Sequence, residues 1–449
     1  MLPLASYNTA TSKDGRYGYH EGVMLSRTLS TLFVYPLAAA FLAAQTAQDP
    51  AAVAKKALDL LLAKKYSELQ PMFARAYREA ATEQQLSKIG VQPAWGAVES
   101  IGNPSVGDMG PIKVITIPVK FAAQTRNFVA YINPSNEIGQ LGFREAETPW
   151  QHPPYAKLDS FKERDVTVGE GDWKLSGTLT VPVGKGPFPA VVLVHGSGAR
   201  DRDDTAFANK AFKDLAEGLA SRGIVVIRYE KRLRQYQSRM SSKSYTLDED
   251  ISEDAAKAAS LLRSQPEVNP AKVYVLGYEL GGYAAPRIAE ADGKLAGIVL
   301  FAANERPLED LFVDQAVATN KPAQYLTGIK VAAARIKKLD QGDADGPPLL
   351  GFPVAYWLDL RSYDPGPLVK DFSGHVLVLA AERDFQVPMT DFAAWKKALE
   401  GRKDTTFKSY PTLNHLFIAG AGPSNEDEYK KPGHVSPDVI DDLAKFLSQ

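Results

Sequence analysis

The chain of 449 residues is long enough for two or three domains, and an apolar fraction of 45% is ordinary for a globular protein with a packed core. Its 52 Lys and Arg side chains nearly balance 53 Asp and Glu side chains, so the net charge of -1 gives no reason to expect a nucleic acid partner. The absence of cysteine excludes disulfide bonds, thiolate metal sites and thiol catalysis.

The N-terminal segment, residues 1–47, has a pattern typical of a secretory signal peptide. Arg27 precedes an apolar stretch, and small and polar residues follow that stretch. The stretch is short for a membrane span, and Pro36 interrupts it. Because the residues before Met24 are polar, translation is expected to start at Met24. We therefore predict a secreted or periplasmic protein with no stable membrane insertion after signal cleavage; an uncleaved anchor is the alternative.

Residues 49–146 are predicted to form a small α+β domain. Apolar residues recur at helical spacing over 51–89, and the residues that follow alternate between apolar and polar, as half-buried strands do. Residues 134–139 supply a hairpin turn between two such strands. This domain offers no catalytic cluster, so a binding or spacing role is favoured. The proline-rich stretch 147–159 is predicted to be a linker.

Residues 160–449 alternate short apolar strands with helical segments. This order predicts an α/β domain with a mostly parallel sheet and helices on both faces. The expected strands lie at 190–196, 224–229, 272–278, 296–303, 375–382 and 406–411. Residues 304–374 have a helical pattern and are too many for a plain crossover. We predict that they form a helical cap insertion over the C-terminal edge of the sheet, where ligands bind in such folds.

The stretch VYVLGYELGGYAAP, residues 273–286, predicts a strand, a tight turn and a helix, with Glu279 at the apex of the turn. Gly277 and Gly281 flank the apex in the pattern G-x-nucleophile-x-G, which lets the backbone turn sharply and exposes the middle side chain above the sheet. In hydrolases built this way a serine usually stands at the apex. The question is what a glutamate does there.

Further features lie at the ends of other expected strands. The turn HGSG follows the first strand, and backbone N–H groups of Ser197 and Leu280 are expected to form an oxyanion hole. Asp384 and His415 each follow a later strand. The order nucleophile, acid, histidine along the chain is the order of the α/β-hydrolases.

From about residue 160 to its end, the chain resembles bacterial α/β-hydrolases of the esterase and serine-aminopeptidase-like group. The motifs that carry the resemblance are HGSG, RYEKR, LGYELGGYAAPRIA, ERDFQVP and LNHLF, in that order. The preceding domain is similar to a small domain of unknown function often fused ahead of such hydrolases. The resemblance implies Asp384 as the triad acid, His415 as the histidine, and Ser197 and Leu280 as the oxyanion donors. The departure is Tyr278-Glu279, where the family typically has His-Ser.

Three interpretations of Glu279 follow. An ionised carboxylate, with an ordinary pKa of about 4.3, can attack an ester carbonyl without a base, and water activated by His415 would hydrolyse the resulting acyl-enzyme anhydride. Alternatively, Glu279 acts as a general base for direct attack by water, or the domain is an inactive binding protein. The presence of Asp384, His415 and both oxyanion turns favours a carboxylic ester hydrolase with a Glu-His-Asp triad.

A carboxylate nucleophile also serves haloalkane dehalogenases and epoxide hydrolases, where it attacks a saturated carbon. Those families usually carry an HGxP turn, and the dehalogenases a tryptophan after the nucleophile, whereas this chain has HGSG and Leu280. This alternative is therefore less favoured. The expected substrate is a small-molecule or polymer-linked ester, contacted by Tyr278, Tyr356 and Trp357. No cofactor is expected, and the histidine spacing predicts no metal site.

Overall fold

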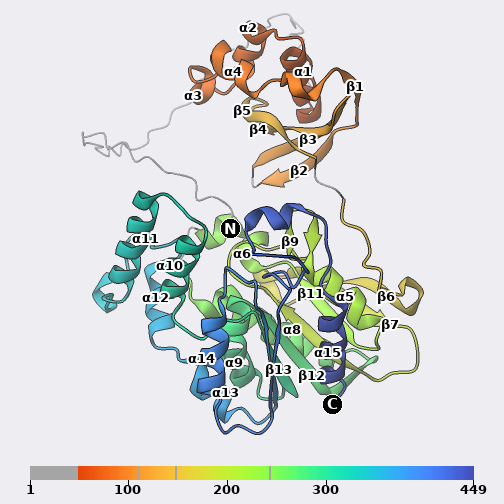
Figure 1. Cartoon of the computed structure of the whole chain (residues 1–449), viewed down its shortest axis with the longest axis vertical. Coiled ribbons are helices and arrows are strands. Elements are labelled where there is room, and N and C mark those ends of the chain that lie inside the picture. Colours follow the sequence, from red (N-terminus) through yellow and green to blue (C-terminus); the bar gives the residue numbers. More distant parts are fainter. Residues whose placement is uncertain (1–48, 110, 147–148, 242–243) are drawn as a thin grey trace, which may run out of the picture. The chain divides into compact units, whose positions relative to one another are not determined.

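The structure, a computed structural model, describes residues 49–449 except 110, 147–148 and 242–243. The predicted signal peptide and the predicted start at Met24 lie outside the described residues. Figure 1 shows a smaller folded part, formed by the first hundred or so described residues, and a larger one formed by the described residues that follow. Among the helices of the described residues, none combines the length and the apolar character needed to cross a membrane.

The smaller part, residues 50–145, has helices followed by an antiparallel sheet. Its elements are α1 (Pro50–Leu62), α2 (Tyr66–Leu69), α3 (Arg75–Arg78), α4 (Glu83–Ile89), β1 (Val98–Ile101), β2 (Ser105–Met109), β3 (Ile112–Phe121), β4 (Thr125–Ile132) and β5 (Ile138–Glu145). The strand order is β1-β3-β4-β5, and β2 also pairs with β3. Helix α1 begins where the Asp49 side chain accepts a hydrogen bond from the Ala51 N–H. The apolar face of α1 packs on the sheet in a core drawn wholly from residues 51–143.

The larger part is built on an eight-stranded sheet with the order β15-β14-β13-β12-β8-β11-β7-β6. The strands are β6 (Phe161–Val168), β7 (Leu175–Pro182), β8 (Phe188–Val194), β11 (Val225–Tyr229), β12 (Val268–Tyr278), β13 (Gly297–Phe301), β14 (His375–Ala381) and β15 (Thr405–Tyr410). Strand β7 pairs antiparallel with both β6 and β11, and the other neighbours pair in parallel. The parallel strands therefore end along one edge of the sheet, where the predicted site residues follow them.

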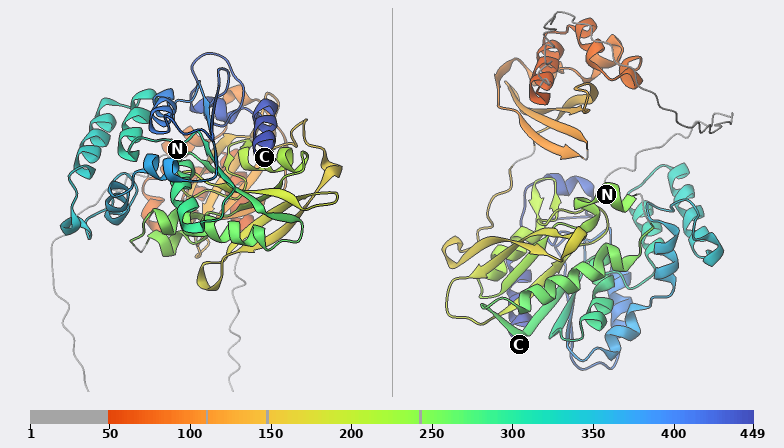
Figure 2. Two further views of the ribbon diagram at one scale, coloured as in Figure 1. Left: turned by 90° about the horizontal axis from the view of Figure 1, so that it is seen from below. Right: turned by 180° about the vertical axis from the view of Figure 1, so that it is seen from behind.

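Helices cover both faces of this sheet (Figures 1 and 2). Val191 and Leu193 of β8 pack in the core that contains α5 (Ala211–Ala220) and α15 (Pro437–Leu447). Val192 and Val194 point the opposite way, into the core with α8 (Glu253–Arg263) and α9 (Leu280–Asp292). Because alternate residues of a strand face opposite sides, a sheet covered on both faces needs continuous apolar strands, which is the pattern in the sequence.

The insertion between β13 and β14 is helical, as its sequence pattern indicates. It contains α10 (Leu308–Ala318), α11 (Ala323–Ile336), α12 (Val354–Arg361) and α13 (Pro365–Asp371). These helices lie together on the side of α14 (Met389–Ala398), as Figure 1 shows. The predicted position over the sheet edge does not hold for all of the insertion. Its C-terminal end packs on the face of the sheet, where the Tyr363 hydroxyl donates to the backbone oxygen of Tyr283 in α9.

Two strands of the eight-stranded sheet were absent from the sequence-based prediction. Strand β6 carries the charged run Lys162 to Asp165 and is largely exposed at the edge of the sheet, so it lacks the apolar pattern of a buried strand. Strand β7 is buried along nearly its whole length, but Ser176 and Gly177 interrupt the apolar pattern of its sequence. The edge position, which only the tertiary structure reveals, explains the missed antiparallel hairpin.

Part of the stretch predicted to be a linker is attached to α5. The Trp150 indole N–H donates to Asp214 at 2.9 Å, and His152 Nδ1 lies 2.8 Å from a carboxylate oxygen of Glu217. The Lys157 N–H donates to the Ser221 hydroxyl. Residues 150–157 therefore belong to the surface of the larger part.

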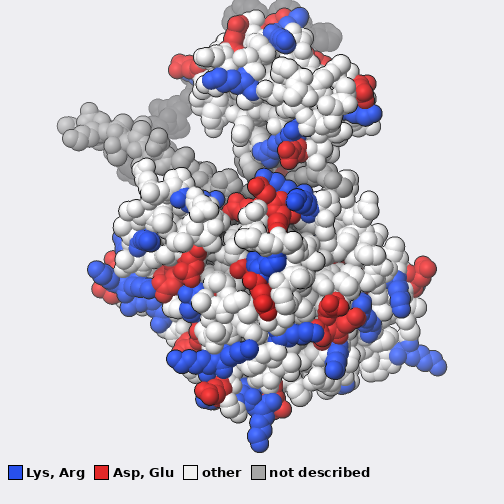
Figure 3. All heavy atoms as spheres, in the orientation of Figure 1, with Lys and Arg blue, Asp and Glu red and all other residues white. Residues whose placement is uncertain are grey.

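On the face of the larger part that Figure 3 shows, acidic and basic side chains are intermingled and form no large area of one sign.

Candidate active site

Glu279 occupies the turn between β12 and α9 in a strained backbone conformation. Its φ of 52° and ψ of -117° lie in a region that costs a non-glycine residue about 1–3 kcal/mol. The Glu279 N–H donates to the Phe301 carbonyl, and the Glu279 carbonyl accepts the N–H of Gly282. A Cβ at Gly281 would lie 2.5 Å from the Val194 and His195 carbonyl oxygens, so glycine lets α9 approach β8. These contacts hold the tight turn between β12 and α9, the elbow, that the sequence predicts.

Glu279 is only 3% exposed, and its carboxylate is turned toward the HGSG turn. The Ser197 N–H donates to Oε2 at 2.9 Å, and the Ser197 hydroxyl lies 2.8 Å from Oε1. A Cβ at Gly196 would lie 2.2 Å from Oε2, so a glycine is required beside the carboxylate. The turn thus forms a fitted cradle for the glutamate side chain.

His415 and Asp384 form a buried pair on the loops after β15 and β14. His415 Nδ1 lies 2.6 Å from Asp384 Oδ2, and both side chains are almost fully buried. Asp384 Oδ1 accepts the N–H groups of Gln386 and Val387, which fix the carboxylate. With Nδ1 engaged by the carboxylate, Nε2 is the nitrogen available for proton transfer. This is the arrangement by which an acid orients a catalytic imidazole.

The electrostatic surroundings keep Glu279 ionised. Burial raises the pKa of its carboxyl group, but attraction to His415 and Arg200 and the hydrogen bonds from Ser197 outweigh burial and lower the pKa below its ordinary value. Arg200 belongs to the same turn, where its Nε donates to the Ser197 carbonyl at 3.0 Å. At neutral pH the site therefore contains a carboxylate, not a carboxylic acid.

The two predicted oxyanion donors differ in whether each N–H already has a hydrogen-bond acceptor. The Leu280 N–H opens α9 and makes no hydrogen bond to another described residue. The Ser197 N–H, in contrast, is bonded to Glu279 itself. The structure therefore brings together Glu279, Ser197, Leu280, His415 and Asp384, but one of the two donors is already bonded to the Glu279 carboxylate.

Comparison with known proteins identifies the family. Esterase EstD of Thermotoga maritima is 36% identical over 345 residues, which span 75% of this chain and 79% of EstD. The chain belongs to the EstD family. No family model matches the sequence. Among solved structures, Est1E from Butyrivibrio proteoclasticus is 12% identical, with a TM-score of 0.43 and 63% and 98% of the two chains covered. The esterase Pf2001 from Pyrococcus furiosus is 13% identical, with a TM-score of 0.40 and 61% and 90% covered.

The strand order and the helices on both faces of the sheet confirm the predicted α/β-hydrolase fold. The resemblance to esterases is confirmed at the level of the family. The replacement of serine by Glu279 as nucleophile and the kinship of the N-terminal domain stay predictions.

Three residues expected to contact substrate in this EstD relative are packed inside the protein. The Tyr278 side chain is buried under the site, with its hydroxyl donating to the His415 carbonyl at 3.2 Å. The Tyr356 hydroxyl donates to Asp250, and the Trp357 indole N–H donates to the Leu349 carbonyl. All three side chains are buried in the core. Tyr356 and Trp357 are buried because the helical insertion packs its large aromatic residues inward, whereas Tyr278 ends the buried strand β12. Their contact with substrate stays a prediction.

Sequence reasoning missed two contributors to the EstD-family site. It assigned Ser197 a backbone role only, whereas the hydroxyl also reaches Glu279. It also passed over Arg200, whose charge acts on Glu279. The position of both residues in the HGSG-A-R turn was the available signal. Among the described residues, no group of three or more His, Asp or Glu side chains is arranged to hold a metal ion.

Proposed function

We propose that this protein hydrolyses carboxylic esters with Glu279, His415 and Asp384, and that Glu279 replaces the serine nucleophile. The family supports the reaction class, since its relative EstD is named an esterase. One observation carries the assignment of Glu279: its carboxyl group stands at the apex of the elbow, bonded to Ser197 and beside the His415–Asp384 pair, and the charge of His415 lowers its pKa. The proposed substrate is a small-molecule or polymer-linked ester.

In the first step, an oxygen of the Glu279 carboxylate attacks the ester carbonyl carbon. The C–O bond to the alcohol breaks, the alcohol leaves with a proton from protonated His415, and a mixed anhydride joins Glu279 to the acyl group. A carboxylate needs no base for this attack, and the lowered pKa of Glu279 keeps the reactive form populated.

In the second step, neutral His415 removes a proton from water, which attacks the anhydride. The products are the free acid and the regenerated Glu279 carboxylate, and the proton on His415 serves the next cycle. Asp384 orients the imidazole and stabilises its protonated form through the 2.6 Å hydrogen bond to Nδ1.

The oxyanion donors must change partners during this sequence. The Leu280 N–H is free to bind the oxygen of the substrate carbonyl from the outset. The Ser197 N–H becomes available only when Glu279 Oε2 moves away from it during the attack. Release of this bond therefore accompanies formation of the anhydride.

The same bond favours a second candidate function, attack of Glu279 on a saturated carbon such as that of an epoxide. In that reaction the Glu279 carboxylate forms an alkyl ester with the substrate. Water must then attack Cδ of Glu279 to hydrolyse this ester. The Ser197 N–H already donates to Glu279 Oε2 and would stabilise the oxyanion formed there. For this reason the substrate panel below includes an epoxide.

A role for Glu279 as general base has less support. A good base has a pKa near the working pH, whereas the surroundings of Glu279 lower its pKa. The interpretation of the domain as an inactive binding protein is weakened by the buried His415–Asp384 pair. Burial of two ionisable groups costs free energy, and a binding protein has no need of this pair.

A panel of nitrophenyl esters of increasing acyl length, with one epoxide, tests the reaction class. The wild type is expected to hydrolyse at least one ester, and Glu279→Gln is expected to lose turnover. Glu309→Gln is the matched control, since Glu309 is also a buried glutamate but lies in α10, away from the site. Equal turnover by the wild type and Glu279→Gln would remove Glu279 from the mechanism.

A single turnover in ¹⁸O-water separates the routes. Attack of water on Cδ of Glu279 leaves the label in the Glu279 peptide, whereas attack on the acyl carbon places it in the acid product. Direct attack of water with Glu279 as base labels only the product, and a covalent adduct on Glu279 would then be absent after rapid quenching.

We also propose that the protein is exported, on the strength of the signal-like residues 24–47. N-terminal sequencing of the mature protein tests this. A mature chain that begins between about residues 45 and 50 is expected, and a mature chain that still carries the apolar stretch would contradict it.

A further inference from the structure

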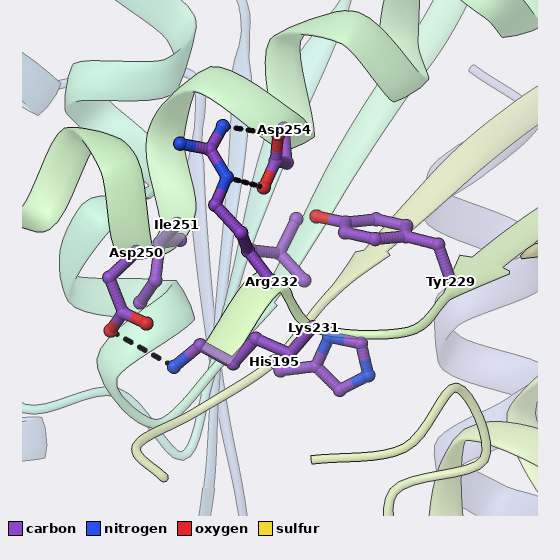
Figure 4. A pocket seen from close by; sticks show the side chains of 8 residues that line it. His195, Tyr229, Lys231, Arg232, Asp250, Ile251 and Asp254 are labelled. Carbon is purple, nitrogen blue, oxygen red and sulfur yellow. Dashed lines mark hydrogen bonds and ion pairs between the residues drawn. The ribbon is translucent and has the colours of Figure 1, made fainter. Parts of the chain in front are cut away.

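Behind the HGSG turn lies a small cavity lined by ionisable side chains that the proposed mechanism does not use. Its lining is Val194, His195, Tyr229, Lys231, Arg232, Asp250, Ile251 and Asp254. Figure 4 shows Lys231 and Arg232 diverging within it, Lys231 toward Asp250 and Arg232 toward Asp254. The cavity therefore holds two buried ion pairs side by side.

Only the Lys231 pair is connected to the site. Lys231 Nζ lies 3.0 Å from Asp250 Oδ2 and 2.9 Å from the Gly196 carbonyl oxygen, and both charged side chains are nearly or fully buried. The Lys231 backbone N–H also donates to the Arg200 carbonyl. Lys231 thus binds the HGSG turn on both sides of Ser197.

The Gly196 carbonyl and the Ser197 N–H belong to one peptide group. An ammonium bound to the oxygen of a peptide draws electron density toward that oxygen and makes the N–H a stronger donor, as in other chains of hydrogen bonds at low dielectric. That N–H is the one that donates to Glu279. A continuous path therefore runs from Asp250 through Lys231 and the peptide to the carboxylate.

We propose that Lys231 is a positioning residue that polarises the Gly196–Ser197 peptide and strengthens its N–H toward the carboxyl group of Glu279. This inference rests on the proposed function, because it assigns a purpose to Lys231 in that same site. It holds for both routes above, since each places an oxyanion within reach of the Ser197 N–H.

Other charged groups around the path do not supply the same effect. Glu279 is faced by His415 and Arg200, and Asp204 adds a nearby negative charge. Lys231 is faced by Asp250 and by His195, whose pKa is lowered to about 3 by burial and by Lys231 itself, so the imidazole stays neutral. Lys231 is therefore the cation bound to the Gly196 carbonyl.

A pair of double variants tests the inference. Lys231→Met with Asp250→Leu removes the connected ion pair, and Arg232→Met with Asp254→Leu removes the neighbouring pair, which makes no bond to the Gly196 carbonyl. Each double variant removes one cation and one anion, so the net charge of the cavity is unchanged. Replacement of both partners also avoids an unpaired buried charge.

The expected readouts are kcat, KM and the acid limb of the pH profile of kcat/KM on the best nitrophenyl ester. That limb reports acylation by Glu279, because nitrophenolate leaves without a proton and the neutral His415 of the second step does not enter kcat/KM. For the Lys231 double variant we expect kcat to fall about tenfold with little change in KM, and the acid limb to move to higher pH because Glu279 binds its proton more readily. The Arg232 double variant is expected to keep kcat within about twofold and to keep the acid limb. Acid limbs that coincide in both double variants and the wild type would overturn the inference.

A direct titration of Glu279 separates this inference from the proposed function. Carbon-13 labelling of glutamate carboxyl groups, with the Glu279 signal assigned by its loss in Glu279→Gln, gives the Glu279 pKa without any turnover. A higher pKa in the Lys231 double variant alone supports the inference even if no ester is hydrolysed. An unchanged pKa overturns it even if the enzyme is active. Should that double variant not fold, Lys231→Gln with Asp250→Asn is titrated instead, which again removes one cation and one anion. A smaller upward shift is expected because the glutamine amide can still donate to the Gly196 carbonyl, and no shift overturns the inference.

Discussion

A carboxylate takes more room than a hydroxyl, and in this site Gly196 provides the room. A Cβ atom added to Gly196 would lie only 2.2 Å from Oε2 of Glu279. The same carboxylate collects both the N–H and the hydroxyl of Ser197. At the scale of single residues, the turn and the glutamate are therefore fitted to each other.

Gly196→Ala is expected to expel the Glu279 carboxylate from its cradle. The added methyl group overlaps both Oε2 and Cβ of Glu279, so the side chain must turn away from the Ser197 N–H. We expect ester turnover to fall at least about a hundredfold, by analogy with the loss of one oxyanion-type donor. Gly328→Ala is the control: nothing lies within 4 Å of the added atom, and an alanine in helix α11 should stabilise it slightly. Full activity in Gly196→Ala would contradict the claim that the Glu279 carboxylate needs a glycine at position 196 to reach the Ser197 N–H.

The lowered pKa of Glu279 predicts a pH-dependent contribution to stability. A carboxyl group whose pKa in the folded state lies below its ordinary value of about 4.3 stabilises the fold above that value, and the stabilisation is lost as the pH falls through the folded pKa. The wild type should therefore exceed Glu279→Gln in free energy of unfolding at pH 7, and the difference should shrink below about pH 4.5. Urea unfolding at both pH values measures this. A difference that grows on acidification would refute the sign of the shift.

At the scale of elements, the helical insertion is tied to the sheet at its first residues. Asp391 of α14 is fully buried and accepts hydrogen bonds from the backbone N–H groups of Glu305 and Arg306. The Arg306 guanidinium also binds it, with one bond of 2.7 Å. One carboxylate thus satisfies several donors at the point where the chain leaves β13 for α10.

Asp391→Asn is expected to loosen this attachment. The new amide nitrogen faces N–H donors from which it cannot accept hydrogen bonds, and the negative charge that pairs with Arg306 is lost. The free energy of unfolding should therefore fall by about 1–3 kcal/mol. Asp310→Asn is the comparison, because Asp310 and Lys337 form an exposed ion pair within the same insertion, worth about 0–1 kcal/mol. Thermal unfolding of the two variants ranks them. Equal melting temperatures would show that Asp391 does not anchor the insertion.

How far the sequence predicts these elements depends on what the pattern records. The buried parallel strands and the elbow at Glu279 follow from local apolar runs and glycine spacing. The edge strand β6 escapes prediction because its exposed, charged residues resemble a loop. The burial of Tyr356 and Trp357 and the direction of the Glu279 carboxylate depend on contacts between distant segments, which spacing along the chain does not contain.

At the scale of the whole molecule, the described chain has separate cores. The core of the smaller part is drawn from residues 51–143, and the cores on the two faces of the larger sheet contain no residue before Tyr155. The boundary that the sequence predicts between the small domain and the hydrolase domain stays a prediction. The stretch 150–157 goes with the larger part through Trp150 and His152.

A chain that starts at residue 149 is expected to fold and to retain activity on small nitrophenyl esters. Its two cores and its site residues all lie within it, so calorimetry should give it a melting temperature close to that of the corresponding transition in the full chain. A loss of more than about half of the unfolding enthalpy expected for its length would contradict the division.

The most direct test of the central claim is to trap the acyl group on Glu279. In His415→Gln the second step lacks its base, while a nitrophenyl ester can still acylate the enzyme because nitrophenolate leaves without a proton. Rapid quenching followed by peptide mass spectrometry should therefore show the acyl mass on the peptide that contains Glu279, and Glu279→Gln in the same background should abolish it. An acyl group found on Ser197, or no adduct at all in an enzyme whose wild type hydrolyses the ester, would contradict the claim that Glu279 is the nucleophile.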